Sequence, residues 1–214
     1  MRRKMMNSRY VQHVREHSSI YLFTTVLFLM GVIFGAIVVN SLNVEQKQGL
    51  YFYLNRFFGQ VSQGQFSNHH EMFQQSFLHN VKYLGLIWIL GISIIGLPLV
   101  LILLFLKGMV VGFTVGFLVN QMGLNGFLLS SVSVLPQNLF LIPAFIILST
   151  LSIAFSLKLV RQQFLKRSKE SISAAFLRYS LSIIGILLFI TLASSFEAYA
   201  SPPLMKSVMS FINK

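Results

Sequence analysis

Apolar residues in this chain gather into long runs that short polar stretches separate. The first run covers residues 20–40, and no Asp, Glu, Lys or Arg lies between Lys82 and Lys107 or between Lys107 and Lys158. A helix of about 20 apolar residues is long enough to cross the hydrocarbon core of a bilayer. The pattern therefore predicts an all-α membrane protein with several spans.

Five spans account for these runs when each is bounded by polar or helix-breaking residues. The expected transmembrane helices are residues 20–40, 81–106, 109–122, 137–157 and 179–198. The third is short, because a polar stretch with two glycines follows it. Either its helix continues through this stretch, or it ends near Met122 and an interfacial helix within 125–135 leads to the next span. We favour the second arrangement.

The remaining segments are polar and lie between or outside the spans. Residues 41–80 contain apolar positions at helical spacing, and Asn68 followed by Glu71 has the spacing of a helix-capping box. This stretch is expected to form two amphipathic helices outside the cytoplasm. The other segments are a cytoplasmic N-terminus (1–19), a cytoplasmic loop (158–178) and an extracytoplasmic tail (199–214).

The charge is strongly basic, at +12, although only 10% of the residues are charged and 55% are hydrophobic. Most of the basic residues fall in the N-terminal segment and in the loop 158–178, as expected of cytoplasmic loops. This explains the charge without a nucleic-acid surface. It predicts an N-terminus inside and a C-terminus outside, with the cytoplasmic side marked by Lys107, Lys158, Arg161, Lys166 and Arg167.

Lys107 opens the sequence KGMVVGFTVGF, which could suggest a phosphate-binding loop. A P-loop, however, places its lysine after the second glycine and a hydroxyl residue beside it. Here the lysine comes first, and the glycines recur every four residues, which aligns them on one helix face. Such small residues let two helices approach closely in a membrane. We expect Lys107 at the turn between spans two and three, and helix packing through Gly31, Gly35, Gly108, Gly112 and Gly116.

The residue inventory argues against catalysis, a metal site or a cofactor. The chain has no Cys and no Asp, and its five histidines all precede the second expected span. His70, Glu71 and His79 lack the i, i+4 spacing of helical zinc ligands. In this interpretation the spans contain no charged residue away from their ends, which disfavours ion-coupled transport. We expect neither an enzyme nor a small-molecule substrate.

Two groups of residues are candidates for a partner-binding surface outside the membrane. Tyr53, Phe57 and Phe58 lie on the first amphipathic helix, and aromatic residues are enriched at contact cores. The alternative is that they pack on the protein's own spans or at the bilayer interface. The second group is Pro136, Gln137 and Asn138, whose alternative role is to cap the start of the fourth span.

Several stretches together resemble the stage II sporulation protein M family. They are HVREHSSIYLF (13–23), MGVIFGAIVVNSLN (30–43), FYLNRFFGQV (52–61), KGMVVGFTVGFLVNQMG (107–123) and LPQNLFLIPAF (135–145). The resemblance extends along the whole chain. It implies a membrane protein of the machinery with which the mother cell of an endospore-forming bacterium engulfs the forespore.

The resemblance also implies a function and partners. Family members are scaffolds without catalysis of their own, which hold stage II sporulation proteins D and P, two peptidoglycan-degrading proteins, at the sporulation septum. Many members carry Leu-Pro-His-Gly and then Glu at the start of the fourth span. This chain keeps Pro136 and Pro143 but has Gln137, Asn138 and Leu141, so a role for that His and Glu does not carry over.

We therefore expect a non-enzymatic scaffold in the cell membrane, at the septum and the engulfing mother-cell membrane. The alternative is a permease subunit that exports a small or lipidic substrate. An ATPase bound to the basic loop at 158–169 would favour the permease.

Overall fold

The computed structural model describes residues 17–62, 68–165 and 172–212, and these residues are helical apart from short turns. The elements are α2 (Ser18–Ser41), α3 (Val44–Ser62), α4 (His69–Gly91), α5 (Gly96–Ser133), α6 (Leu135–Leu165), α7 (Ile172–Ser195), the π-helix η1 (Phe196–Ala200) and α8 (Ser201–Ile212). The expected all-α fold class is confirmed.

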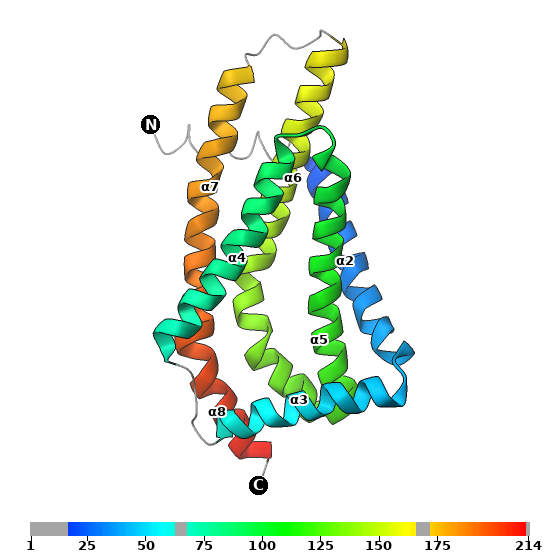
Figure 1. The fold of residues 1–214 in the computed structure, drawn as a ribbon, viewed down its shortest axis with the longest axis vertical. Helices are drawn as coiled ribbons and strands as arrows, with labels where there is room; N and C mark the ends of the chain where they lie inside the picture. The colour runs from blue at the N-terminus through cyan, green and yellow to red at the C-terminus, as the bar shows by residue number, and fades with distance from the viewer. Residues whose placement is uncertain (1–16, 63–67, 166–171, 213–214) are drawn as a thin grey trace.

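The long helices α2, α4, α5, α6 and α7 run along one another as a bundle (Figure 1). Helices α3 and α8 lie across one end of it, on the side where α5 gives way to α6 (Figure 1). Below, this is called the α3/α8 end. The opposite end holds the start of α2, the turn between α4 and α5, and the end of α6.

Four helical stretches are long and apolar enough to cross a membrane. They are Ser18–Ser41, Gly96–Ser133, Leu135–Gln163 and Ser173–Ser210. Helix α4 runs beside them, but its first half carries His69, His70, Glu71 and His79. The structure thus supports a multi-pass membrane protein with four such helices.

The segment expected as one span over residues 81–106 is not one helix. Helix α4 ends at Gly91, and α5 begins at Gly96 after a tight turn. Gly96 permits this turn, because a Cβ there would overlap the Leu90 carbonyl. Pro98 stands in the first turn of α5, where its missing N–H leaves no helical bond unmade. The expectation of one transmembrane helix over residues 81–106 was therefore wrong.

This turn changes the position of Lys107. Helix α5 continues through Lys107 and Gly108, so residues 81–106 and 109–122 are not two spans joined there. Lys107 lies 11 residues into α5, about 17 Å from its start at 1.5 Å per residue. Lys107 is therefore inside the bundle, and the prediction that it marks a cytoplasmic turn was wrong.

Helix α5 is interrupted after Met122, where the sequence suggested a break. Gly123 has φ 57° and ψ −130°, a conformation that residues with a side chain rarely adopt. The segment after it folds back, since a Cβ at Gly126 would overlap the Leu118 carbonyl. Leu118 and Leu129 are buried together there against Leu54 of α3 and Val208 of α8.

The last two long helices exceed their expected bounds at the basic loop. Helix α6 runs to Leu165 and α7 begins at Ile172, so the described parts of the expected loop, 158–165 and 172–178, are helical. The described part of the expected tail, 199–212, is also helical, because η1 and α8 continue the line of α7 to Ile212.

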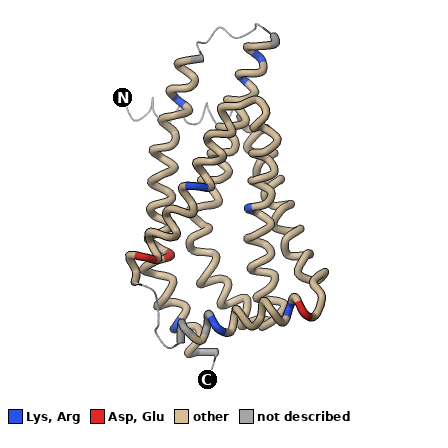
Figure 2. The backbone as a smooth tube through the Cα atoms, viewed as in Figure 1, with Lys and Arg blue, Asp and Glu red and all other residues tan. Residues whose placement is uncertain are grey.

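Charges are distributed unevenly over this fold. Figure 2 shows basic residues towards the free ends of α6 and α7, and both signs around α3 and α8. The length of the bundle between them carries few charges (Figure 2). One of these is the single charge of α5, which is Lys107.

Candidate functional site

The predicted glycines lie at one interface, between α2 and α5. A Cβ on Gly35 would overlap the Met109 carbonyl, and one on Gly112 would overlap the Val32 carbonyl. Gly31 and Gly108 are placed in the same way, against the backbone at Phe105 and Phe28. Gly116 meets Ala36, with contacts from 3.0 Å. These glycines let the two backbones touch, as small residues do between membrane helices.

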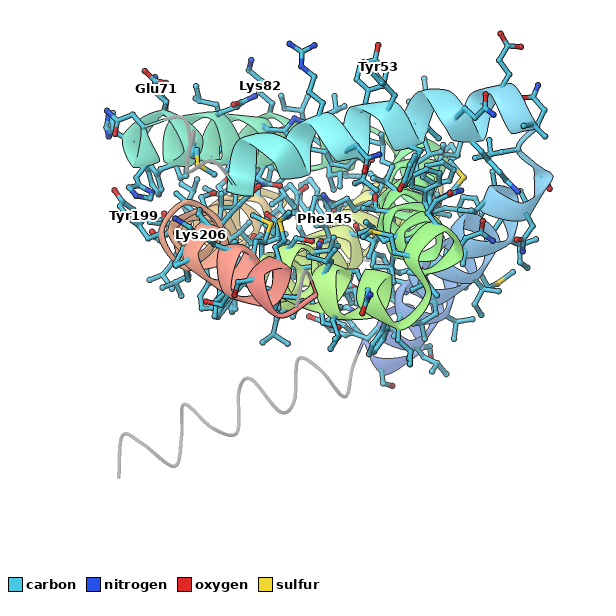
Figure 3. The ribbon with its side chains drawn as sticks, turned by 90° about the horizontal axis from the view of Figure 1, so that it is seen from below. Tyr53, Glu71, Lys82, Phe145, Tyr199 and Lys206 are labelled. Carbon is cyan, nitrogen blue, oxygen red and sulfur yellow. The ribbon has the colours of Figure 1, made fainter. Side chains whose placement is uncertain are left out.

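Lys107 projects from the other side of α5, towards α4 and α6. Its ammonium nitrogen lies 5.0 Å from the ring centre of Phe145 and 5.9 Å from that of Tyr83. Phe145 is fully buried, and Figure 3 shows it among the helices rather than at their outer surface. Aromatic faces attract a cation, most strongly away from water. Lys107 is thus a cation held inside the bundle.

The carboxylate of Glu197 lies inside the same bundle and interacts electrostatically with Lys107 and with His79. The Ser76 hydroxyl of α4 donates to it. With its amide nitrogen facing the carboxylate, Gln137 of α6 donates to Oε1 at 3.0 Å. Oγ of Ser76 also lies 3.1 Å from Oγ of Ser194 of α7, whose hydroxyl can donate to it. Helices α4 and α6 therefore both bond Glu197, and Ser76 connects this site to α7.

The local backbone explains why Glu197 faces inwards. It lies in the π-helix η1, which inserts into the line from α7 to α8. A π-turn changes the direction of the side chains that follow it and is common at functional sites. His69 of α4 fixes this turn from outside, since its Nδ1 lies 2.8 Å from the Ala198 carbonyl and its ring stacks on Tyr199.

Two further polar atoms near this region are buried without a hydrogen-bond partner. They are Oδ1 of Asn138 and Oγ of Ser201. Asn138 neighbours Gln137, and Ser201 follows Glu197 by one helical turn. The polar residues Ser76, Lys107, Gln137, Asn138, Ser194, Glu197 and Ser201 are named the internal polar cluster below.

A second polar group lies closer to the other end of the bundle. The Tyr179 hydroxyl of α7 donates to the Trp88 carbonyl at 2.8 Å and lies 2.8 Å from Oγ of Ser152. Its ring is stacked between Trp88 and Phe155, at centroid distances of 5.8 and 4.9 Å. This group joins α4, α6 and α7 and carries no charge.

The candidate surface residues fall in different environments. Tyr53 is 69% exposed and points away from the bundle in Figure 3. The side chains of Phe57 and Phe58 lie outside the described residues. Asn138 is only 4% exposed, and Gln137 contacts Glu197, so these two belong to the internal polar cluster rather than to an outer surface. Pro136 beside them is half-buried.

The basic residues predicted to mark the cytoplasmic side fall into two groups. Lys158 and Arg161 lie in the last turns of α6, whereas Lys166 and Arg167 lie outside the described residues. Among the described residues, no group of His, Cys, Asp and Glu is arranged to hold a metal ion.

Comparison with known proteins gives one match. The family model SpoIIM, described as stage II sporulation protein M, matches residues 24–202, which is most of the chain. The chain belongs to the stage II sporulation protein M family. The match includes most of α2, the helices from α3 to η1 and the start of α8, and so includes the internal polar cluster. No curated protein and no solved structure matches the chain.

Sequence reasoning placed the charged pair of this cluster at the membrane edges. Glu197 ends an apolar run and Lys107 stands between two such runs, which is also the pattern of helix ends. One signal was available: the apolar runs on both sides of Lys107 are long. Such runs are equally consistent with a lysine in the middle of one long helix. No pattern in the sequence predicts the π-turn at Glu197.

Proposed function

We propose that this member of the family is a non-enzymatic membrane scaffold with five crossings, an inside N-terminus and an outside C-terminus. It holds the wall-degrading stage II sporulation proteins D and P at the sporulation septum and in the engulfing membrane. Family membership supports a sporulation-related membrane protein. The inside-to-outside direction rests on the basic residues near the ends of α6 and α7. In this arrangement α4 is the additional crossing.

The observation that carries the scaffold proposal is the layer formed by α3 and α8. The two helices cover one end of the bundle, opposite the basic end (Figures 1 and 2). The outer face of α3 exposes Phe52 and Tyr53, at 64% and 69%. Aromatic side chains that are exposed together are typical of contact surfaces and of membrane interfaces. The layer is therefore suited to a partner that works at the membrane surface.

Copurification tests the scaffold. The tagged full-length protein, isolated from sporulating membranes, is expected to recover proteins D and P. Recovery of an ATPase without either wall-degrading protein would overturn the proposal and favour a permease.

Variants of α3 test the proposed contact surface. Replacing Phe52 and Tyr53 by Ala should lower partner recovery roughly tenfold, as loss of aromatic contact residues does at many interfaces. The amount of this protein in the membrane should stay the same. The control is Gln48→Ala, an exposed change on the same helix. Phe57→Ala and Phe58→Ala extend the test along α3. Unchanged partner recovery in all of these variants would show that the partner does not bind to α3.

A permease subunit is the second candidate, and the internal polar cluster favours it. Charged residues within membrane helices are costly and commonly mark transport pathways. Lys107 and Glu197 occupy such positions. A permease of this kind requires an ATPase partner, so the same copurification separates the two candidates.

A further inference from the structure

Helix α4 has a polar face that its own bundle leaves uncovered. Gln75, His79 and Lys82 are exposed and follow one another at i, i+4 and i+7, which places them along one side of the helix. Figure 3 shows Lys82 at the outer edge of the molecule, pointing away from the buried Phe145. This polar face of α4 is therefore open to whatever surrounds the bundle.

The depth of Lys82 decides what can cover this face, and the inference rests on the proposed function, in which α4 crosses the membrane. Lys82 then lies about 14 Å from the end of α4 at Gly91, near the middle of a hydrocarbon core about 30 Å thick. Only lysines near a helix end extend to the headgroups easily. A central lysine that faces lipid costs about 2.5–3.5 kcal/mol on insertion scales. The polar face of α4 is thus unsuited to lipid.

A second copy of the chain is also unsuited to this face. Copies with the same orientation in a membrane hold α4 at the same depth, so a symmetric contact through this face puts Lys82 opposite Lys82. Like charges repel strongly in a medium of low dielectric constant. Glu71 is the only acidic residue of α4, and it lies about 17 Å along the helix from Lys82, too far away to compensate.

We propose that the polar face of α4 binds a membrane helix of a different protein, which carries an Asp or Glu near its middle, beside Lys82. A carboxylate there compensates for the lysine charge, and polar side chains such as Gln75 strengthen association between membrane helices. Figure 3 also shows Tyr53 of α3 along the same side of the molecule as Lys82. One partner can therefore contact α4 within the membrane and the proposed surface on α3 outside it.

Site-specific cross-linking in the full-length protein tests this contact. The photo-reactive residue p-benzoylphenylalanine is placed at Leu78, which is 44% exposed and lies one helical turn before Lys82. The expected adduct joins this position to a membrane helix that contains an Asp or Glu. Lys82→Met should lower the yield of this adduct about tenfold, whereas Lys82→Arg should retain it because the charge is kept.

Two controls are matched to these changes. The same photo-reactive residue at Ile184, which is 64% exposed on α7, should give no adduct with this partner. Lys206→Met removes an exposed lysine from α8 and should leave the adduct at Leu78 unchanged. The unfolding midpoint of the purified Lys82→Met protein should stay within about 2 °C of the parent, because Lys82 is exposed. A larger fall would assign Lys82 to packing within this chain and overturn the proposal.

Charge reversal tests the role of the carboxylate. Lys82→Glu should abolish the adduct, and replacing the partner's Asp or Glu by Lys should restore it. Adducts with lipid alone, with a second copy or with a helix that has no carboxylate would overturn the proposal. An adduct whose yield Lys82→Met leaves unchanged would overturn it as well.

The crossing of α4 has a separate test. The chain has no cysteine, so Lys82→Cys introduces a single thiol. A membrane-impermeant thiol reagent should label it at least about tenfold more slowly than Gln48→Cys, at an exposed position of α3. Equally fast labelling would show that α4 lies outside the membrane, and would overturn the crossing together with this inference. Protection of Lys82→Cys combined with adducts to lipid alone would overturn only the inference.

Discussion

Two interfaces of this bundle achieve close packing by different means. Between α2 and α5, glycines bring the backbones into contact, and no side chain separates Gly35 from Met109 or Gly112 from Val32. Between α4, α6 and α7, side chains fill the space, with Tyr179 stacked between two rings and bonded to Trp88 and Ser152.

The two interfaces differ in the substitutions that they tolerate. Lipid gives membrane helices no hydrophobic reason to associate, so van der Waals contact and hydrogen bonds must hold them together. Backbone contact between glycines leaves no space for any added atom. Side-chain contacts can lose one hydroxyl and keep their shape. We therefore expect a single added side chain to disrupt the interface between α2 and α5. Loss of a single hydroxyl should weaken the interface between α4, α6 and α7 only slightly.

The largest effect is expected from Gly112→Leu. Even its Cβ would overlap the Val32 carbonyl, so the helices must separate, at a cost of about 3 kcal/mol or more. The amount of folded protein in the membrane and its unfolding midpoint measure this. The matched control is Gly185→Leu, since Gly185 is exposed on α7 and an added Cβ there has no neighbour within 4 Å. Equal loss in both variants would contradict the backbone contact.

A smaller effect is expected from Tyr179→Phe. The change removes the hydroxyl that contacts Trp88 and Ser152 but keeps the ring in its stack, so about 1–1.5 kcal/mol should be lost. The unfolding midpoint measures the loss. The chain has a single tryptophan, so its fluorescence reports on the stack and should change little. A large change in Trp88 emission would show that the hydroxyl is needed to position the ring.

The third test measures coupling within the hydroxyl group. Ser152→Ala and Tyr179→Phe remove partners that lie 2.8 Å apart, so the double variant should lose less than the sum. The expected coupling energy is about 0.6 kcal/mol, as for other hydrogen bonds between membrane helices. Additive losses in the unfolding free energy would mean that the two hydroxyls act separately.

The smallest effect is expected from Thr24→Val, which removes a contact between α2 and α6. Oγ1 of Thr24 lies 3.0 Å from Oγ1 of Thr150 but also 3.0 Å from the Ile20 and Tyr21 carbonyls of its own helix. Because the hydroxyl has local partners, its contribution between helices should be about 0.5 kcal/mol or less. A loss comparable to that of Tyr179→Phe would assign Thr24 a larger role in holding α2.

Particular elements show how far the sequence could be interpreted. The first apolar run, expected at 20–40, is α2 at Ser18–Ser41, because polar residues flank the run at both ends. The break after Met122 was suggested by neighbouring glycines and polar residues, and Gly123 adopts a conformation that glycine favours. Such local signals are independent of what the helix packs against.

The turn between α4 and α5 illustrates the opposite case. Its residues, Ile92–Ile95, are nearly as apolar as the helices on both sides, so hydropathy gives no boundary there. The turn is decided by the approach of Gly96 to the Leu90 carbonyl and by the contact of Gly91 with Ser152 and Tyr179. Ser152 and Tyr179 are distant from Gly91 in sequence, so no local pattern predicts their contact with it.

The sequence alone determined that this is an all-helical membrane protein, that its glycines recur on one face, and that its basic residues gather in a few segments. These properties depend on composition and on a period of 3.6 residues, which act locally along the chain. Only the tertiary structure decided that Lys107 and Glu197 both lie inside the bundle, between α4 and α6. Their positions depend on a tight turn and a π-helix, which redirect helices and side chains without changing the apolar pattern.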